Sequence, residues 1–162
     1  MTSPAVHSTF RLERTYAASP ARVFAAFADP VAKRRWFVEG ERWRVQDHTL
    51  DFRVGGRETS RFLFEGGPAG APPAGTPMGN DTTYQDIVPG ERIVFAYTMS
   101  IAGRCFSASL ATVEIAPAGD GSRLVFTEQA AFFEGADGPA MREQGWNALL
   151  DALGAELRRV AE

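Results

Sequence analysis

The sequence that decides the fold is DGPAMREQGWNALLDALGAELRRV, residues 137–160, because it predicts one long amphipathic helix near the end of the chain. Gly138-Pro139 is typical of a helix start, and apolar residues then recur every three or four positions. These apolar residues are Trp146, Leu149, Leu150, Leu153, Leu157 and Val160. Gly145 and Gly154 lie inside the helix, where each costs about 1 kcal/mol relative to alanine. We therefore expect Gly145 to be a point of close contact with a sheet.

Upstream of this helix, residues 43–132 form a series of β-patterns separated by turn residues. The predicted strands are 43–54, 57–65, 82–88, 92–102, 105–116 and 122–132. The clearest is the fourth, whose alternate residues on one face are Ile93, Phe95, Tyr97, Met99 and Ile101. No helical pattern separates these strands, so the sequence favours antiparallel hairpins over parallel crossovers.

The N-terminal part of the chain predicts one strand followed by two short helices. Residues 8–16 alternate between apolar and polar side chains, which is typical of a half-buried strand. Ser19-Pro20 is a helix-start signal. Asp29-Pro30 ends this helix and begins a second one, which runs to Phe37.

The predicted fold class is therefore α+β: a strand, two short helices, six strands and one long helix in a single domain over residues 1–162, with its core in 8–160. Adjacent strands are rotated by about 20–25°, so a sheet of seven antiparallel strands must curve. We expect it to wrap around the C-terminal helix. The helix cannot fill such a sheet along its whole length, and the remaining gap is the predicted functional site.

One stretch, residues 66–79, predicts a loop, because it contains 5 glycines and 4 prolines in 14 positions. Two interpretations stay open for it. It is either a lid beside the mouth of a pocket or a mobile connector.

Composition and charge exclude several classes of protein. The sequence has one cysteine, Cys105, which excludes an intrachain disulfide and a cysteine zinc cluster. It has only two histidines, His7 and His48, and we predict no metal and no cofactor. The net charge of −3, without a basic stripe, argues against a nucleic-acid partner. No apolar run reaches the length of a membrane span and no signal-peptide pattern is present, so we expect a cytoplasmic protein. The sequence does not decide between a monomer and a homodimer.

Several motifs occur together over residues 8–160. They are Ser19–Phe24, Asp29-Pro30, Arg35–Phe37, Asp51–Gly56, Tyr84–Phe95, Thr127-Glu128 and Gly145-Trp146 with Leu149-Leu150. In this order they resemble the START-like, birch-pollen-allergen-like (SRPBCC) superfamily with its helix-grip fold, and within it the branch named after the activator of the heat-shock protein 90 ATPase. The resemblance implies the fold given above. It does not imply one activity, because the superfamily includes ligand carriers, polyketide cyclases and co-chaperones.

The candidate ligand-binding residues are mainly aromatic and methionine side chains on the predicted inner faces. They are Trp36, Arg53, Phe62, Phe64, Tyr84, Phe95, Tyr97, Met99, Trp146 and Leu150. Aromatic and methionine side chains line adaptable apolar pockets, and Arg53, Tyr84 and Tyr97 are expected to orient a polar group of the ligand. For the apolar members of this set the alternative is ordinary core packing.

Arg14 and Glu128 each interrupt the apolar face of a predicted strand, and Asp51 and Arg53 share one strand face just before Gly55-Gly56. Arg14 and Glu128 lie on the first and last strands, which are neighbours in the family, so we expect them to form a buried salt bridge. The alternative is that one of them orients a ligand. Asp51 and Arg53 either clamp a hairpin or meet a ligand head group. His48, among polar neighbours, is predicted to be an exposed strand residue.

The leading hypothesis is that the domain binds a small hydrophobic or amphipathic molecule between the sheet and the helix. One alternative is a cyclase or hydrolase acting on a bound aromatic or polyketide-like substrate, for which the titratable candidates are Glu128, Asp51 and the tyrosines. We assign no catalytic residue, because no ordered acid–base pair is visible. The other alternative is a co-chaperone-like module that binds proteins through its outer face.

Overall fold

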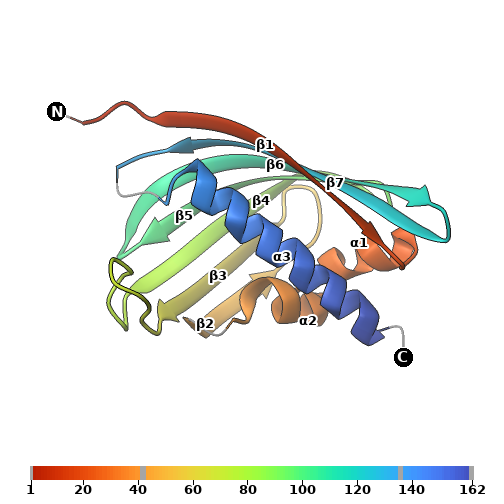
Figure 1. The fold of residues 1–162 in the computed structure, drawn as a ribbon, viewed down its shortest axis with the longest axis horizontal. Coiled ribbons are helices and arrows are strands. Elements are labelled where there is room, and N and C mark those ends of the chain that lie inside the picture. The colour runs from red at the N-terminus through yellow and green to blue at the C-terminus, as the bar shows by residue number, and fades with distance from the viewer. Residues whose placement is uncertain (1, 41–42, 135–136, 161–162) are drawn as a thin grey trace.

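The computed structural model describes residues 2–40, 43–134 and 137–160, and it contains a seven-stranded sheet (Figure 1). The strands are β1 (Val6–Tyr16), β2 (Trp43–Leu50), β3 (Arg57–Phe64), β4 (Pro77–Val88), β5 (Arg92–Ile101), β6 (Arg104–Ala118) and β7 (Gly121–Phe132). Their order across the sheet is β1-β7-β6-β5-β4-β3-β2, and all neighbours are antiparallel. The predicted α+β fold is confirmed.

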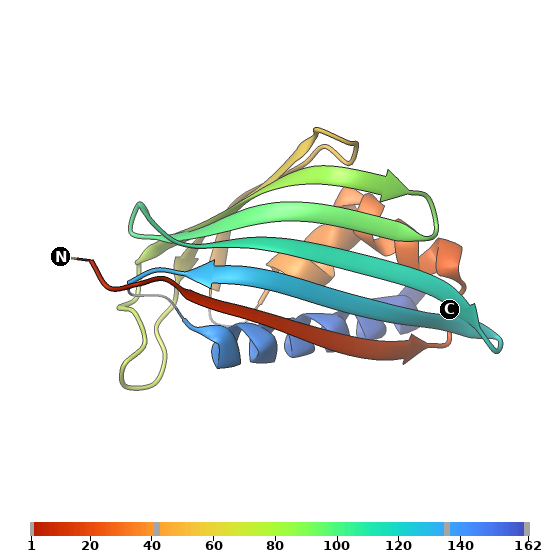
Figure 2. The same ribbon diagram turned by 90° about the horizontal axis from the view of Figure 1, so that it is seen from above.

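The helices of the described chain cover one face of this sheet, which curves over them (Figure 2). They are α1 (Pro20–Ala28), α2 (Pro30–Lys33), the π-helical turn η1 (Arg34–Val38) and α3 (Pro139–Val160). Both predicted start signals are confirmed: the Ser19 hydroxyl accepts the Arg22 N–H at 3.3 Å, and the Asp29 carboxylate accepts the Val31 N–H at 3.0 Å. None of the described helices is both long and apolar enough to cross a membrane.

The second half of α3 forms the core with α1 and the sheet. Leu150, Leu153 and Leu157 are buried there, in one cluster with Val23 and Phe27. This confirms the predicted apolar stripe for these leucines, while the side chain of Val160 lies outside the described residues. The leucines thus fill the core beneath the C-terminal half of α3, and Trp146 extends the same core beneath its N-terminal half.

The two glycines of α3 differ in their surroundings. A Cβ atom on Gly154 would lie 3.3 Å from Cε1 of Tyr16, so this glycine lets the tyrosine ring pack closely against the helix. A Cβ atom on Gly145 would meet nothing within 4 Å. The expected contact between Gly145 and the sheet is therefore wrong, and Gly145 faces open space.

The glycine- and proline-rich stretch is shorter than predicted, because Pro77, Met78 and Gly79 belong to β4. Pro77 is tolerated as the first residue of its strand, where a missing N–H costs least. Gly79 lies opposite Arg61 of β3 in register. The remaining loop, residues 65–76, extends from the end of the sheet at which α3 begins (Figures 1 and 2).

Strand β2 also ends earlier than predicted, at Leu50, and residues 51–56 form the turn to β3. Gly55 has a φ of +80°, and a Cβ atom on Gly56 would lie 2.1 Å from the carbonyl oxygen of Asp51. Both glycines are thus required by the turn. As a result Asp51 and Arg53 lie in an exposed turn instead of on a strand.

Candidate ligand-binding cavity

A cavity of about 410 Å³ lies between the first half of α3, η1 and the inner faces of β3, β4 and β5. Its volume is within the range of about 300–1,000 Å³ that is typical of small-molecule sites. Much of its wall is aromatic or aliphatic, and it includes all three tryptophans of the sequence, Trp36, Trp43 and Trp146. It occupies the gap that the sequence predicts between the sheet and the helix.

The three strands contribute alternate residues to the wall, because successive side chains of a strand point to opposite faces. These residues are Ser60, Phe62 and Phe64 of β3, Met78 and Asn80 of β4, and Tyr97 and Met99 of β5. The strands are hydrogen-bonded neighbours in the sheet. Their cavity-facing side chains therefore form one continuous surface.

Helix α3 contributes the long side chains of Arg142, Trp146 and Leu149 to the cavity wall and, beside them, a line of mostly short side chains. Met141, Gly145, Ala148 and Ala152 recur every three or four residues and so lie on one side of the helix. Glycine and alanine project little from the helix axis. Part of the space beneath the first half of α3 therefore stays unfilled, whereas the leucines of the second half fill the core.

The mouth of the cavity lies between the end of η1 and the first turns of α3. Glu39, Gly40, Met141, Gly145 and Ala148 line it and are exposed to solvent. No residue of the 65–76 loop lines the cavity, so the interpretation of this loop as a lid has no structural support.

The turn η1 positions the aromatic wall opposite α3. The Trp36 indole N–H donates to the carbonyl of Ala26 at 2.8 Å, and the Trp43 indole N–H donates to the carbonyl of Val38 at 2.6 Å. These two N–H groups are used within the protein. Both indoles therefore offer a ligand apolar surface instead of a hydrogen bond. Single π turns of this kind are frequent at functional sites.

One side of the cavity is closed by a polar network around Arg142, which is 5% exposed. Its guanidinium donates to both carboxylate oxygens of Asp137 at 3.1 Å, to the hydroxyl of Ser107 at 2.7 Å and to that of Ser109 at 3.1 Å. It also donates to the Tyr97 hydroxyl at 3.2 Å. A buried guanidinium is stable only when its N–H groups are bound in this way.

The Tyr97 hydroxyl connects this network to Glu128. It donates to Glu128 Oε1 and accepts the Trp146 indole N–H at 3.1 Å. Burial raises the pKa of Glu128 above its usual range, and the Tyr97 hydrogen bond and the positive charge of Arg142 offset only part of this effect. Glu128 itself does not line the cavity, so it positions Tyr97 and Arg142 and does not offer its carboxyl group to a ligand.

Replacing Tyr97 with phenylalanine is expected to lower the free energy of unfolding by about 2 kcal/mol, because Glu128, Arg142 and Trp146 each lose a buried hydrogen-bond partner. Tyr16→Phe is the matched control, since the Tyr16 hydroxyl makes one hydrogen bond, to a backbone carbonyl of α3. We expect this control to cost about 1 kcal/mol. Urea denaturation measures both values, and equal losses would contradict the network.

A second buried polar cluster adjoins the cavity around Glu58 of β3. The Lys33 ammonium lies 3.0 Å from Glu58 Oε1, the Tyr84 hydroxyl donates to the same oxygen at 2.7 Å, and His48 Nε2 lies 2.8 Å from Oε2. Burial alone raises the pKa of Glu58, but the charge of Lys33 and the three hydrogen bonds together lower it to about 2. The prediction of an exposed His48 is wrong, because the histidine side chain is buried against Glu58.

Six of the ten candidate residues meet in the cavity, and four lie elsewhere. The six are Trp36, Phe62, Phe64, Tyr97, Met99 and Trp146. Arg53 is exposed and pairs with Asp51 at 2.8 Å, and Tyr84 is bound to Glu58. Phe95 and Leu150 are buried in the core. Arg53 and Tyr84 therefore do not orient a ligand in this cavity.

The expected salt bridge between Arg14 and Glu128 is also wrong. The strands β1 and β7 are neighbours, but their register places Arg14 opposite Leu124 and Phe10 opposite Glu128. Arg14 instead donates to the side chains of Asn147 at 2.7 Å and Asp151 at 3.3 Å on α3. Glu128 has Arg142 as its cationic partner, at 3.4 Å.

Ser60, Asn80 and Arg142 were missed by the analysis of the sequence, although each breaks an apolar pattern. Ser60 precedes Phe62 and Phe64 on one face of its strand, and Asn80 follows Met78 in the same way. Arg142 lies four residues before Trp146, on the apolar side of the helix. A polar residue in an otherwise apolar register is the signal that points to these positions.

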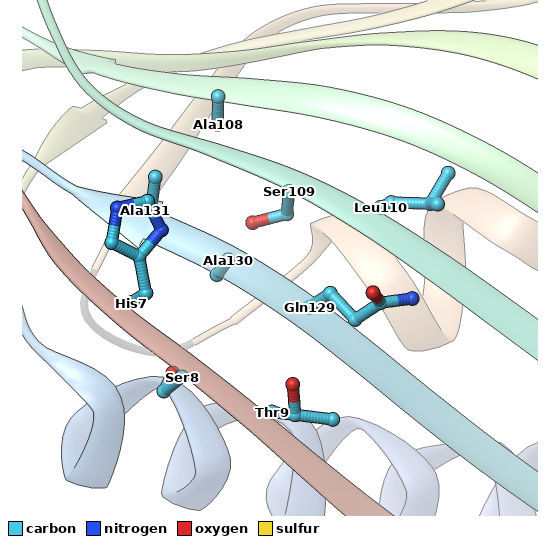
Figure 3. A pocket seen from close by; sticks show the side chains of 9 residues that line it. All are labelled: His7, Ser8, Thr9, Ala108, Ser109, Leu110, Gln129, Ala130 and Ala131. Carbon is cyan, nitrogen blue, oxygen red and sulfur yellow. The ribbon is translucent and has the colours of Figure 1, made fainter.

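The sheet has a second depression, on the outer face of β1, β6 and β7 (Figure 3). Figure 3 shows the short side chain of Ala131 beside the ring of His7, with Thr9, Gln129 and Leu110 farther along the strands. The depression is about 680 Å³ in volume, but it lies open on the surface. A ligand there would stay hydrated on one side, so the cavity beneath α3, which is more enclosed, is the better candidate site.

Comparison with known proteins identifies the family. The family described as "Activator of Hsp90 ATPase homolog 1-like protein" matches residues 17–158, whereas no curated protein matches the sequence. Among solved structures, the Mll3558 protein from Rhizobium loti is 50% identical over 95% of this chain and 99% of its own, with a TM-score of 0.83. A protein from Rhizobium leguminosarum is 38% identical over 98% of this chain and 99% of its own, with a TM-score of 0.86. This chain belongs to the Activator of Hsp90 ATPase homolog 1-like family, as its motifs indicate.

Proposed function

We propose that this protein binds a small, neutral and largely apolar molecule in the cavity beneath the first half of α3. The observation that carries the proposal is the cavity itself, whose volume of about 410 Å³ is lined by all three tryptophans and by methionines from two strands and the helix. A gap of this size costs stability when nothing occupies it. A ligand that fills it recovers the lost contacts.

The binding free energy comes mainly from removing apolar surface from water, about 25 cal/mol for each Å². Trp36 and Trp43 are held by hydrogen bonds to the backbone, so this part of the wall is formed before a ligand arrives. Met78, Met99 and Met141 supply flexible side chains that adapt to the shape of the ligand.

The charges around the cavity favour a neutral ligand. The Arg142 guanidinium already donates to Asp137, Glu128 and three hydroxyl groups. An anionic ligand gains little from it, because the ligand first has to displace the Asp137 carboxylate. The partly apolar wall also disfavours a cationic ligand, which loses its hydration there.

Titration with N-phenyl-α-naphthylamine, a neutral dye that fluoresces in apolar sites, tests the proposal. We expect saturable binding of one dye molecule for each chain. Because all three tryptophans line the cavity, the bound dye is expected to quench most of the tryptophan emission by energy transfer.

Protein unfolded in urea is the control for this titration, and it is expected to give neither signal. Dye emission that rises without saturation contradicts the proposal. Saturation without a loss of tryptophan emission also contradicts it, because the dye then binds away from the cavity.

A further inference from the structure

Two buried polar atoms in the wall of the cavity, Ser60 Oγ and Asn80 Oδ1, have no hydrogen-bond partner among the described residues. Ser60 is 1% exposed. The two residues lie directly opposite each other in the ladder between β3 and β4. Opposed side chains of antiparallel strands have their Cβ atoms about 5 Å apart, so one small group can contact both.

These two atoms do not contribute a hydrogen bond to the stability of the fold. Their neighbours on the cavity face of the same strands, Phe62 and Met78, are apolar. In contrast, the buried hydroxyls of Ser107 and Ser109 are bound by Arg142. An unpaired buried polar group destabilises a folded protein, so two of them opposite each other in one cavity wall point to a partner from outside the chain.

We infer that Ser60 and Asn80 bind a hydroxyl group of the ligand, an inference that rests on the proposed function. A hydroxyl group can both donate and accept. Its O–H donates to Asn80 Oδ1, and its oxygen accepts the hydroxyl proton of Ser60. The ligand is then an apolar alcohol or phenol whose carbon skeleton contacts the tryptophans and methionines of the wall.

Other polar groups fit this pair of atoms less well. With the Asn80 amide oriented so that Oδ1 is the buried, unpaired atom, a ketone or an ether, which only accepts hydrogen bonds, leaves Oδ1 without a donor. A carboxylate places negative oxygens against the same amide oxygen. An ammonium group brings a positive charge to this part of the wall, and no acidic side chain lines the cavity on β3 or β4 to balance it.

Competition between two probes and the dye tests the inference. β-Naphthol and β-methylnaphthalene have nearly the same size and shape, but only the first carries a hydroxyl group. The measured quantity is the ratio of their concentrations at half displacement of N-phenyl-α-naphthylamine. The two probes differ in their hydration free energy, but this difference is the same for every variant of the protein. It therefore cancels when the ratio is compared between wild type and a variant.

The double variant Ser60→Ala/Asn80→Leu is expected to reduce the preference for β-naphthol by about tenfold, which corresponds to one to two lost hydrogen bonds. Ser60→Ala alone is expected to reduce it by about threefold. Both variants replace unpaired polar groups with apolar ones, so we expect them to fold and to bind the dye. Thr98→Val is the matched control, because it removes a hydroxyl group from an exposed position of β5 and is expected to leave the ratio unchanged.

The outcomes separate this inference from the proposed function. An unchanged ratio in both Ser60 variants, with dye binding intact, overturns the role of the pair and leaves the cavity as the binding site. A wild-type protein that does not bind the dye contradicts the proposed function and the inference together.

Discussion

Glu58→Gln is expected to lower the free energy of unfolding by about 3–5 kcal/mol at neutral pH, the largest effect on stability that we predict. The substitution keeps the shape of the side chain but leaves the Lys33 ammonium, which is 3% exposed, without its counter-charge. Tyr84 and His48 lose a charged hydrogen-bond partner in the same step. Urea denaturation of the wild type and the variant measures the difference.

Two further variants distinguish the loss of the buried Lys33–Glu58 ion pair from the general effect of removing a charge. Lys33→Met combined with Glu58→Gln removes both charges, and we expect it to recover most of the lost stability. Asp51→Asn breaks the exposed pair with Arg53 and is expected to change stability by less than about 0.5 kcal/mol. A Glu58→Gln effect as small as that of Asp51→Asn would contradict the account of the cluster.

The same carboxyl group predicts how stability depends on pH. The pKa of Glu58 is lowered from an ordinary value of 4.5 to about 2 in the folded protein. A carboxyl group with a lowered pKa contributes its full stabilisation above about pH 4.5 and loses it as the pH falls towards 2. The difference corresponds to about 3 kcal/mol. Urea denaturation at several pH values measures this effect. As the pH falls, we expect the free energy of unfolding to decrease more in the wild type than in Glu58→Gln.

Gly145→Leu is expected to weaken binding of N-phenyl-α-naphthylamine by about 100-fold or more. A Cβ atom on Gly145 meets nothing within 4 Å, and Gly145 lines the cavity, so a leucine side chain occupies the space that a ligand needs. Leucine also has a higher helix propensity than glycine, and this difference stabilises the folded protein by up to about 1 kcal/mol. The fluorescence titration measures the affinity.

Gln144→Leu is the matched control, because it places the same side chain one residue earlier on α3, at an exposed position that does not line the cavity. This variant is expected to bind the dye like the wild type. If Gly145→Leu also keeps its affinity for the dye, the site does not lie beneath the first half of α3.

The order of strands and helices was predictable because its signals are local. Alternation marks the strands, and Ser19 and Asp29 begin the helices that follow them. Strand register is not local. The sequence correctly placed Arg14 and Glu128 on neighbouring strands. In the register of β1 and β7, however, Glu128 lies opposite Phe10, four residues before Arg14, so the two side chains do not pair.

The sheet side of the cavity was more predictable than the helix side. Phe62, Phe64, Tyr97 and Met99 follow from alternation on strands that face the helix. The helix side is formed partly by glycine and alanine, which carry no chemical signal of a site. Arg53 was misplaced because the glycines after it end the strand early, so its side chain never reaches the inner face.

The claim that a ligand binds between α3 and the sheet is tested most directly by proton–nitrogen NMR spectra recorded during addition of N-phenyl-α-naphthylamine. We expect the indole N–H signals of Trp36, Trp43 and Trp146 to shift together, because all three rings line the cavity. The backbone amides of Leu110 and Gln129, in the outer depression, are expected to stay in place. Shifts confined to those outer amides, or indole signals that do not move at saturating dye, contradict the account.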